Sequence, residues 1–176
     1  MRTRGFTLIE LMVVIAIIGL LASIITISLV SSKAKGRDAK RVADVRTIQL
    51  ALETYYNDNG TYPVTIYNAP FTPNYLTTVP TDPNSQAAYK YSAYNSAGSA
   101  NCTTNLPIRY HLAAVMESSD TQGSPLPYNS VLKQDNDWSS GGLSACTGST
   151  ADFNGNALNC SGGANSYDNC YDVTTN

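Results

Sequence analysis

One carboxylate, that of Glu10, stands immediately before an apolar stretch that contains no other charged residue. The stretch runs from Leu11 to Val30 and is twenty residues long. At about 1.5 Å of rise per residue, a helix of this length is about 30 Å long, which matches the hydrocarbon core of a membrane. The sequence therefore predicts a membrane-spanning helix, and the lone ionisable group at its mouth is a candidate functional residue.

The residues around Glu10 form a motif. Gly5-Phe6-Thr7-Leu8-Ile9-Glu10, followed by the apolar stretch, resembles the N-terminus of bacterial type IV pilins and type II secretion major pseudopilins, which carry a class III prepilin signal. The resemblance implies that residues 1–5 are a leader peptide, that prepilin peptidase cuts after Gly5, and that the new N-terminal Phe6 is methylated. Because the cut precedes the apolar stretch, the mature chain keeps its helix.

Glu10 has two interpretations. In the first, its carboxylate lies in the first helical turn, where the helix dipole favours it by about 0.3–1 kcal/mol. In the second, cleavage creates an amine on Phe6 that is largely cationic at neutral pH and lies four residues away on the same helix face. A buried carboxylate must be paired, and the amine of the same or of a neighbouring chain can pair it. In the resembled family the neighbour's amine is the partner, which implies an assembly charge pair between Glu10 and Phe6.

The charge count and the cysteines predict opposite orientations for this span. Arg2 and Arg4 precede it, whereas five cations between Lys33 and Arg41 follow it, so the positive-inside rule places the C-terminal side in the cytoplasm. The motif and the four cysteines place that side outside. We follow the motif and predict a single-pass precursor in the inner, cytoplasmic membrane that later joins an extracellular or periplasmic filament.

The helix is predicted to continue beyond the apolar stretch, from Phe6 to about Asn57, over about 78 Å. Its second half carries one stripe with a spacing of three or four residues, made of Val42, Val45, Ile48 or Gln49, Leu52, and Tyr55 or Tyr56. Other faces are expected to hold Lys40, Asp44, Arg46 and Glu53. Residues 57–60 supply the residue types that end a helix. The predicted organisation is a leader (1–5), a transmembrane and filament-core helix (6–32), an amphipathic helical half (33–57) and an extracytoplasmic head (58–176).

The head is predicted to contain a small antiparallel sheet. One face of the sheet packs on the helix, and the other face is half-exposed. Residues 87–94 and 107–116 alternate in polarity and are the expected strands, with a weaker third strand at 130–134. His111 is expected on the less buried face. The predicted class is α+β with the pilin fold, in which residues 139–166, rich in Ser, Gly and Asn, form surface loops.

The four cysteines all lie in the head, at positions 102, 146, 160 and 170. An even number in an exported domain predicts two disulfides, for which three pairings exist. The chain has no Cys-x-x-Cys and a single histidine, which argues against a zinc site. We therefore interpret the four cysteines as forming disulfide cross-links that stabilise a loop-rich C-terminal region: Cys102, Cys146, Cys160 and Cys170.

No cofactor is expected, with calcium as the one alternative. Asp135, Asp137 and Asp152 lie in oxygen-rich segments, and some major pseudopilins bind calcium in their C-terminal loops. The segment from Asp152 lacks the full spacing of a calcium loop and its distal glutamate. Turn chemistry explains the same residues equally well.

Other functions find little support in the sequence. We find no nucleophile–base set and no phosphate-binding loop, so an enzyme is not expected. The head after Asn57 carries three cations and nine carboxylates, a net charge of −6, which argues against a nucleic-acid surface. Three tripeptides match the acceptor pattern of N-linked glycosylation, whose use depends on the machinery of the host: Asn59-Gly-Thr61, Asn101-Cys-Thr103 and Asn159-Cys-Ser161.

We therefore predict a structural subunit of a type IV pilus-like filament. The resemblance implies four partners: other copies of the chain in a helical homopolymer, prepilin peptidase, the inner-membrane assembly platform with its ATPase, and the membrane before assembly. The alternatives are a major pseudopilin of a type II secretion system, a minor pilin for adhesion or DNA uptake, and a membrane-anchored domain that never polymerises.

Overall fold

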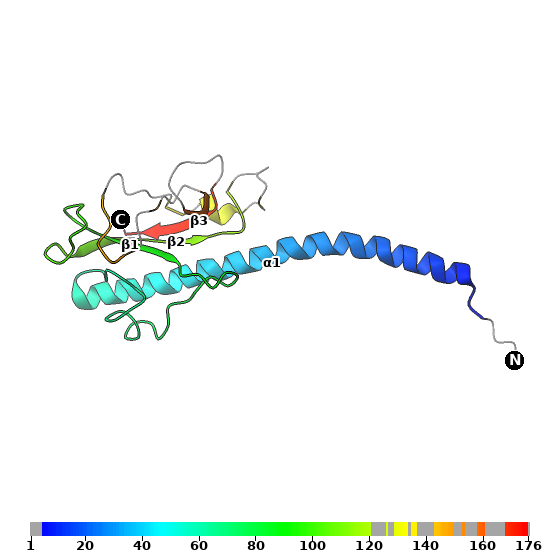
Figure 1. Cartoon of the computed structure of the whole chain (residues 1–176), viewed down its shortest axis with the longest axis horizontal. Coiled ribbons are helices and arrows are strands. Elements are labelled where there is room, and N and C mark those ends of the chain that lie inside the picture. The colour runs from blue at the N-terminus through cyan, green and yellow to red at the C-terminus, as the bar shows by residue number, and fades with distance from the viewer. Residues whose placement is uncertain are drawn as a thin grey trace.

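A computed structural model describes residues 5–120, 126, 129–133, 135–136, 143–149, 153, 158–160 and 168–175, without the side chains of 24–28. One long helix, α1 (Leu8–Asn59), precedes the strands β1 (Lys90–Asn95), β2 (Pro107–Val115) and β3 (Cys170–Thr174). Two short 3-10 helices, Ser130–Lys133 and Leu158–Cys160, lie between β2 and β3. The sheet lies along the C-terminal half of α1, and the N-terminal half projects beyond it (Figure 1). The predicted α+β pilin fold is confirmed.

Both ends of α1 are fixed by local capping. Thr7 is the N-cap residue in an extended conformation, so the helix begins at Leu8, two residues later than predicted. At the other end Gly60 adopts the left-handed conformation (φ 69°), and its N–H donates to the Tyr56 carbonyl at 2.7 Å. Glycine occupies this conformation without the penalty that a Cβ brings, which explains why the helix ends at Asn59.

The projecting half of α1 exposes its apolar side chains. Phe6 is 84% exposed and Leu8 is 73% exposed, and large apolar residues remain exposed along the segment up to Leu21 and again at Leu29 and Val30. None of the helices in the described part combines the length and the apolar character that a membrane crossing requires. The predicted span includes residues 24–28, whose side chains lie outside that part.

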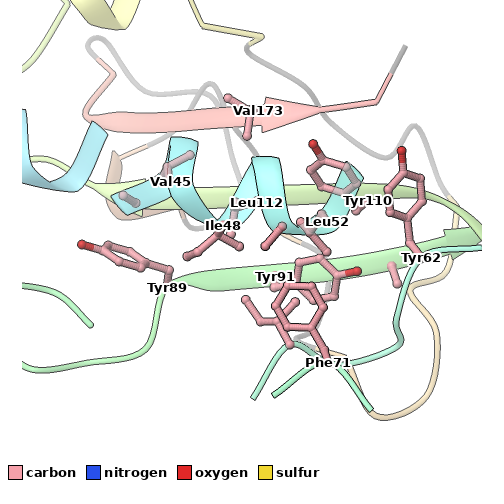
Figure 2. Packing of buried hydrophobic residues seen from close by; sticks show 14 of the residues in the cluster. Val45, Ile48, Leu52, Tyr62, Phe71, Tyr89, Tyr91, Tyr110, Leu112 and Val173 are labelled. Carbon is pink, nitrogen blue, oxygen red and sulfur yellow. The ribbon is translucent and has the colours of Figure 1, made fainter. Parts of the chain in front are cut away.

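The C-terminal half of α1 forms the floor of the core. Val45, Ile48 and Leu52 are fully buried and Tyr55 is nearly so, which confirms the predicted stripe. Side chains from the sheet and from the connection that follows α1 pack against them, as Figure 2 shows for Tyr91, Leu112 and other members of the cluster. Since each fully buried aliphatic or aromatic side chain contributes roughly 1.5–3 kcal/mol, this stripe contributes strongly to the attachment of the head to its helix.

The sheet has the order β1-β2-β3 and is antiparallel throughout. In β1 and β2, Lys90 pairs with Ala113 and Tyr94 with Arg109, and the register shifts after Tyr94. The third strand is not where it was predicted. Residues 130–133 form a 3-10 helix, and the strand that pairs with β2 is the C-terminal β3, in which Cys170 faces Val115.

The sheet is covered on both faces, contrary to the prediction of a half-exposed sheet. Tyr110, Leu112 and Ala114 belong to the cluster against α1, whereas Ala113 packs on the opposite face with Phe153, Cys160 and Cys170. His111 is fully buried on that face: its ring stacks on Phe153 with centroids 3.8 Å apart, and Nε2 lies 2.8 Å from Asp172 Oδ2. His111 was predicted on the less buried face because it alternates with Tyr110. The prediction is wrong because Phe153 and β3, which cover that face, lie far along the chain.

The four cysteines form two disulfides, Cys102–Cys146 and Cys160–Cys170. The first ties the loop between β1 and β2 to a segment 44 residues later. The second ties the short 3-10 helix at residues 158–160 to the first residue of β3, ten residues later. Two disulfides were predicted, and the structure selects one of the three possible pairings.

The two disulfides are expected to differ in their contribution to stability. With loops of 44 and 10 residues, the chain-entropy relation gives about 4.0 kcal/mol for Cys102–Cys146 and about 2.7 kcal/mol for Cys160–Cys170. The Cys102→Ala/Cys146→Ala double variant should therefore unfold at a lower urea concentration than the Cys160→Ala/Cys170→Ala variant. Equal midpoints, or the reverse order, would contradict this ranking.

Candidate functional site

The first turn of α1 holds Glu10 in a capping box with Thr7. Glu10 Oε2 accepts hydrogen bonds from the Thr7 N–H at 2.8 Å and from Thr7 Oγ1 at 2.7 Å, and the Glu10 N–H donates to Thr7 Oγ1 at 3.3 Å. This reciprocal arrangement satisfies backbone donors that have no partner within the helix. Thr7 was not predicted as a site residue, although Thr-x-x-Glu before an apolar run is the sequence signature of the box.

The predicted cleavage site lies just outside this capped turn. Gly5 and Phe6 precede the helix in non-helical backbone, and both are exposed. The Phe6 nitrogen is a peptide amide until the bond after Gly5 is cut. The capping box places the Glu10 carboxylate on the Thr7 N–H, one residue from Phe6. Cleavage at Gly5 and pairing between Phe6 and Glu10 stay predictions.

Glu10 lies in an apolar groove on one face of α1. Phe6, Ile9, Val13 and Val14 line the groove with it. The helical residues among them, Ile9, Glu10, Val13 and Val14, have the spacing of a single helix face. Since monomeric soluble proteins rarely expose a large apolar surface, this face is a candidate interface in which the carboxylate is the one polar group.

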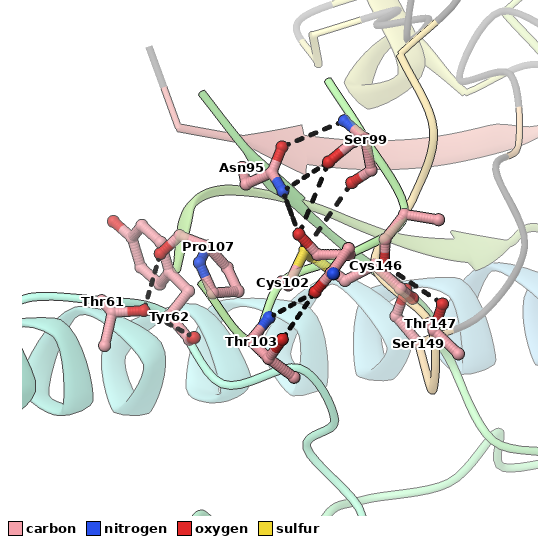
Figure 3. Close-up of a disulfide and its surroundings, with 12 residues drawn as sticks. Thr61, Tyr62, Asn95, Ser99, Cys102, Thr103, Pro107, Cys146, Thr147 and Ser149 are labelled. Carbon is pink, nitrogen blue, oxygen red and sulfur yellow. Dashed lines mark hydrogen bonds between the residues drawn. A yellow bond between two sulfur atoms is a disulfide. The ribbon is translucent and has the colours of Figure 1, made fainter. Parts of the chain in front are cut away.

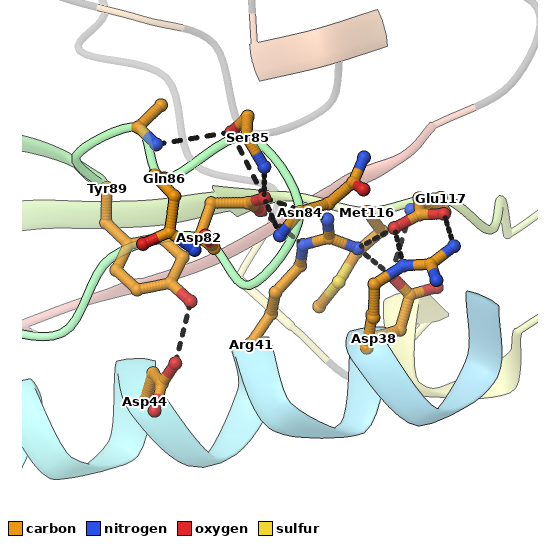
Figure 4. Close-up of polar contacts among 12 residues, drawn as sticks. Asp38, Arg41, Asp44, Asp82, Asn84, Ser85, Gln86, Tyr89, Met116 and Glu117 are labelled. Carbon is orange, nitrogen blue, oxygen red and sulfur yellow. Dashed lines mark hydrogen bonds and ion pairs between the residues drawn. The ribbon is translucent and has the colours of Figure 1, made fainter. Parts of the chain in front are cut away.

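A second cluster, of charged side chains, joins α1 to the head (Figure 4). Its centre is Arg41, whose side chain is 3% exposed. The guanidinium contacts three carboxylates: Asp38 at 2.7 Å, Asp82 at 2.6 Å and Glu117 at 2.9 Å. Asp38 lies one turn earlier in α1, Asp82 lies before β1, and Glu117 follows β2. This Arg41 cluster therefore joins α1 to two segments of the head.

The carboxylates of the Arg41 cluster have further hydrogen-bond partners besides Arg41. Arg37 forms an ion pair with Glu117, and its Nε donates to Glu117 Oε1 at 2.7 Å. Asp38 accepts from the Glu117 N–H at 2.9 Å and from the Ser118 hydroxyl. Asp82 Oδ1 accepts from the backbone N–H groups of residues 84 and 85 at 2.9 and 2.8 Å. Buried charges are stable only when paired and hydrogen-bonded in this way.

A neighbouring contact corrects a further prediction. Asp44 was expected on a face of α1 away from the core, yet it is 6% exposed. Its carboxylate pairs with Lys40 at 2.8 Å and accepts a hydrogen bond from the Tyr89 hydroxyl at 2.9 Å. The helical charges of this region therefore bind the head, in addition to the apolar stripe.

The surroundings of Asp82 and Glu117 set their protonation. Burial alone would raise the pKa of Asp82, but hydrogen bonds from Arg41, Ser85 and Asn84 outweigh it and hold that pKa well below its ordinary value of 3.8. The hydrogen bond from Arg37 lowers the pKa of Glu117 below its ordinary value of 4.5, with a further contribution from Arg41. Both groups are therefore carboxylates throughout the neutral range.

Acid should destabilise the head through these two carboxylates. A lowered pKa in the folded state means that the unfolded chain binds more protons, so this stability is present above pH 4.5 and is lost as the pH falls through the folded-state pKa values. We expect the free energy of unfolding, measured with urea, to fall as the pH is lowered from about 6 to about 2. The linkage relation places the loss in this range because it begins near the ordinary pKa values of the two groups. The Asp82→Asn variant, in which one of the groups cannot titrate, should show a shallower fall. An equal slope in both proteins would contradict this assignment.

The predicted calcium ligands are mostly outside the described residues. Asp137 and Asp152 lie outside, and Asp135 Oδ2 accepts a hydrogen bond from the Asp172 N–H at 3.3 Å. In the part of the chain that the structure describes, no group of three or more His, Cys, Asp or Glu side chains could hold a metal ion. Calcium binding stays a prediction.

Comparison with known proteins bears on the N-terminal segment. A family model described as the prokaryotic N-terminal methylation motif matches residues 1–26. The chain carries a prepilin methylation motif. The predicted resemblance to the pilin and pseudopilin family is thereby confirmed for this segment, which includes Gly5, Phe6 and Glu10.

Curated relatives extend the match beyond the methylation motif. The chain is 47% identical over 64 residues to the type II secretion system core protein G of Pectobacterium carotovorum subsp. carotovorum, covering 36% of this chain and 41% of the relative. The identity to the Escherichia coli K12 protein of the same name is also 47% over 64 residues, or 36% of this chain and 44% of the relative. The type IV major pilin protein PilA of Myxococcus xanthus is 34% identical over 61 residues, which is 35% of this chain and 28% of PilA.

These matches cover less than half of each of these relatives. No solved structure matches the chain. The relatives are named as pilus and secretion-system components, and the function of the whole chain is therefore a proposal.

Proposed function

We propose that this chain is a structural subunit of a type IV pilus-like filament and polymerises through the N-terminal half of α1. The observation that carries the proposal is the apolar face around Glu10, which projects beyond the head and begins with a methylation motif. A surface of this kind is stable in water only when it is covered. Packing against the same segment of other copies covers it.

The proposed sequence of events follows the motif. The precursor is anchored in the membrane by the uncharged sequence from Leu11 to Val30, prepilin peptidase cuts after Gly5, and the amine of Phe6 is methylated. The exposed, non-helical backbone at Gly5 and Phe6 is suited to cleavage. An assembly platform and its ATPase then move the subunit from the membrane into the filament.

The free energy of assembly comes from burial and from one charge pair. Each large apolar side chain that is removed from water contributes roughly 1.5–3 kcal/mol. The Glu10 carboxylate would enter the same apolar environment, which is costly unless it is paired with a cation. In the single chain, the Glu10 carboxylate accepts hydrogen bonds from Thr7. In the filament, the cationic amine of Phe6 on a neighbouring copy can take the place of Thr7 as its partner.

A major pseudopilin of a type II secretion system is the second candidate. It is favoured by the relatives named core protein G, which are 42–47% identical, whereas PilA is 34% identical. A pseudopilin would form a short fibre confined to the cell envelope. A minor pilin, the third candidate, would be rare in the filament and would carry a bound ligand.

Mass spectrometry of filaments sheared from cells tests the proposal and separates the candidates. We expect a peptide that begins at methylated Phe6 in abundant long fibres. Cleaved and methylated protein that stays in the envelope fraction would identify the pseudopilin. Uncleaved protein in the membrane fraction, with none in fibres, would overturn the proposal.

A further inference from the structure

The three Asn-x-Ser/Thr tripeptides differ in the hydrogen bonds that their asparagine side chains make. In the first, Asn59 lies at the end of α1, where its Nδ2 donates to the Tyr55 carbonyl at 2.9 Å and to the Tyr75 hydroxyl at 3.0 Å. The Thr61 hydroxyl donates to the Pro107 carbonyl at 2.8 Å instead of turning towards Asn59. The amide nitrogen of Asn59 is therefore engaged in fixing the helix end and is a poor acceptor.

The third tripeptide begins in the 3-10 helix at residues 158–160. The Asn159 N–H donates to Asn169 Oδ1 at 2.6 Å, and Asn159 Oδ1 accepts from Asn169 Nδ2 at 3.2 Å. Its middle residue, Cys160, is fully buried and bonded to Cys170. Ser161 lies outside the described residues. Asn159 is exposed, but its backbone N–H and its side-chain oxygen are both bonded to Asn169, the residue before β3.

The second tripeptide has the geometry of an acceptor. Asn101 and Thr103 are both exposed. Asn101 Oδ1 accepts two hydrogen bonds from Thr103, one from the N–H at 3.1 Å and one from the hydroxyl at 2.6 Å. Because a backbone N–H can only donate, the side-chain atom that it contacts is the oxygen, and the amide nitrogen points away. Within the described part of the chain, Asn101 Nδ2 donates no hydrogen bond.

Hydrogen bonds and a disulfide hold the backbone of the loop around Asn101. The buried Asn95 Nδ2 donates to the Asn101 carbonyl at 2.8 Å, and Asn95 Oδ1 accepts from the Ser99 N–H at 3.1 Å (Figure 3). Cys102 is bonded to Cys146, and the Thr147 N–H donates to the carbonyl of residue 100 at 2.9 Å. Asn101 lies at a surface groove that Thr103 and Thr147 also line.

We propose that Asn101 is an acceptor for an N-linked glycan transferred from a lipid-linked oligosaccharide. In the transfer, the Asn101 amide nitrogen forms a bond to the anomeric carbon of the first sugar. The bond from that carbon to the phosphate oxygen of the lipid carrier breaks, the lipid phosphate leaves with the bonding electron pair, and the amide nitrogen loses one proton to a base of the transferase. No oxidant or reductant is involved.

Thr103 is a positioning residue in this step. An amide nitrogen is a weak nucleophile because its lone pair is delocalised onto the carbonyl oxygen. Two donors on Oδ1 stabilise the negative charge that develops on that oxygen as the nitrogen loses its proton, as oxyanion donors do in acyl transfer. The loop between β1 and β2 lies at the end of the head farthest from the start of α1 (Figure 1). A glycan there would stay clear of the apolar helix segment.

The test uses the folded, disulfide-bonded full chain in detergent, with a single-subunit oligosaccharyltransferase and a lipid-linked oligosaccharide as the donor. Short peptides that span each tripeptide are the reference, and peptide mass spectrometry locates the sugar. We expect all three peptides to be modified, but only Asn101 in the folded chain. Failure of the Asn101 peptide, an unmodified folded chain, or equal transfer to Asn59 or Asn159 would each overturn the proposal.

Two variants separate positioning from folding. Thr103→Ser keeps the hydroxyl, whereas Thr103→Val removes it with little change of volume. We expect Thr103→Val to lose about ten-fold or more in the initial rate at Asn101, and Thr103→Ser to stay within a few-fold of the parent. In both variants, mass spectrometry must show that the Cys102–Cys146 disulfide has formed. If both variants react at the rate of the parent, Thr103 does not position Asn101 and that part of the proposal is wrong. This outcome is independent of whether the chain forms filaments.

Discussion

A chain with Glu10→Gln is expected to fold, to be cleaved after Gly5 and to fail to assemble. Glutamine has nearly the shape of glutamate and is also a residue of the capping box, so the first turn of α1 should keep its contacts with Thr7. What the variant lacks is the charge. In an apolar interface, the amine of Phe6 on the neighbouring copy would be left without its carboxylate, which costs about 2–5 kcal/mol per contact. A loss of this size at every subunit of a filament should reduce fibres below detection.

The measurement is the amount of chain in sheared fibres, with the total amount and the N-terminal mass as controls for folding and processing. Thr7→Val is the matched variant, because it removes the capping hydroxyl and keeps the charge. Loss of an N-cap costs about 1 kcal/mol, so fibres should fall by no more than about ten-fold. Normal fibres with Glu10→Gln, together with lost fibres in Thr7→Val, would show that Glu10 acts only through the helix cap.

The parts of the fold that follow from neighbouring residues could be predicted from the sequence. The apolar stripe of α1 recurs every three or four residues, and Ile48 and Leu52 are buried as that spacing predicts. Glycine after a run of Asn and Asp predicts the end of the helix near residue 57, and α1 ends two residues later, at Asn59. Thr7 and Glu10 carry the signature of a capping box. These signals lie within one or two helical turns, where local sequence decides local structure.

The parts that depend on distant residues could not be predicted. The Arg41 cluster joins residues that are 41 and 76 positions apart, and no local pattern shows which charges will meet. The burial of His111 depends on Phe153 and on the C-terminal strand, which has five residues and no long alternation. The choice among three disulfide pairings has the same cause, since pairing follows the path of the chain and not the spacing of cysteines.

The Arg41 cluster leads to the second large prediction, which concerns the stability of the head. Replacing Arg41 by methionine keeps most of the side-chain volume but leaves Asp38 and Asp82 without the cation that they share. Breaking a buried ion pair in this way costs about 3–5 kcal/mol, because the remaining carboxylates cannot be solvated. Since small domains have only about 5–15 kcal/mol of stability in total, Arg41→Met should lower the urea midpoint of the full chain markedly.

Two further variants decide whether the uncompensated charge is the cause. Arg46 lies on the same helix and is exposed, so Arg46→Met should change the free energy of unfolding by no more than about 0.5 kcal/mol. The double variant Arg41→Met/Asp82→Asn removes one of the stranded carboxylates while keeping its shape. It should be more stable than Arg41→Met alone, although it carries one more substitution. If the double variant is instead the less stable of the two, the loss in Arg41→Met comes from packing of the arginine side chain, and the Arg41 cluster acts through contact area and not through charge.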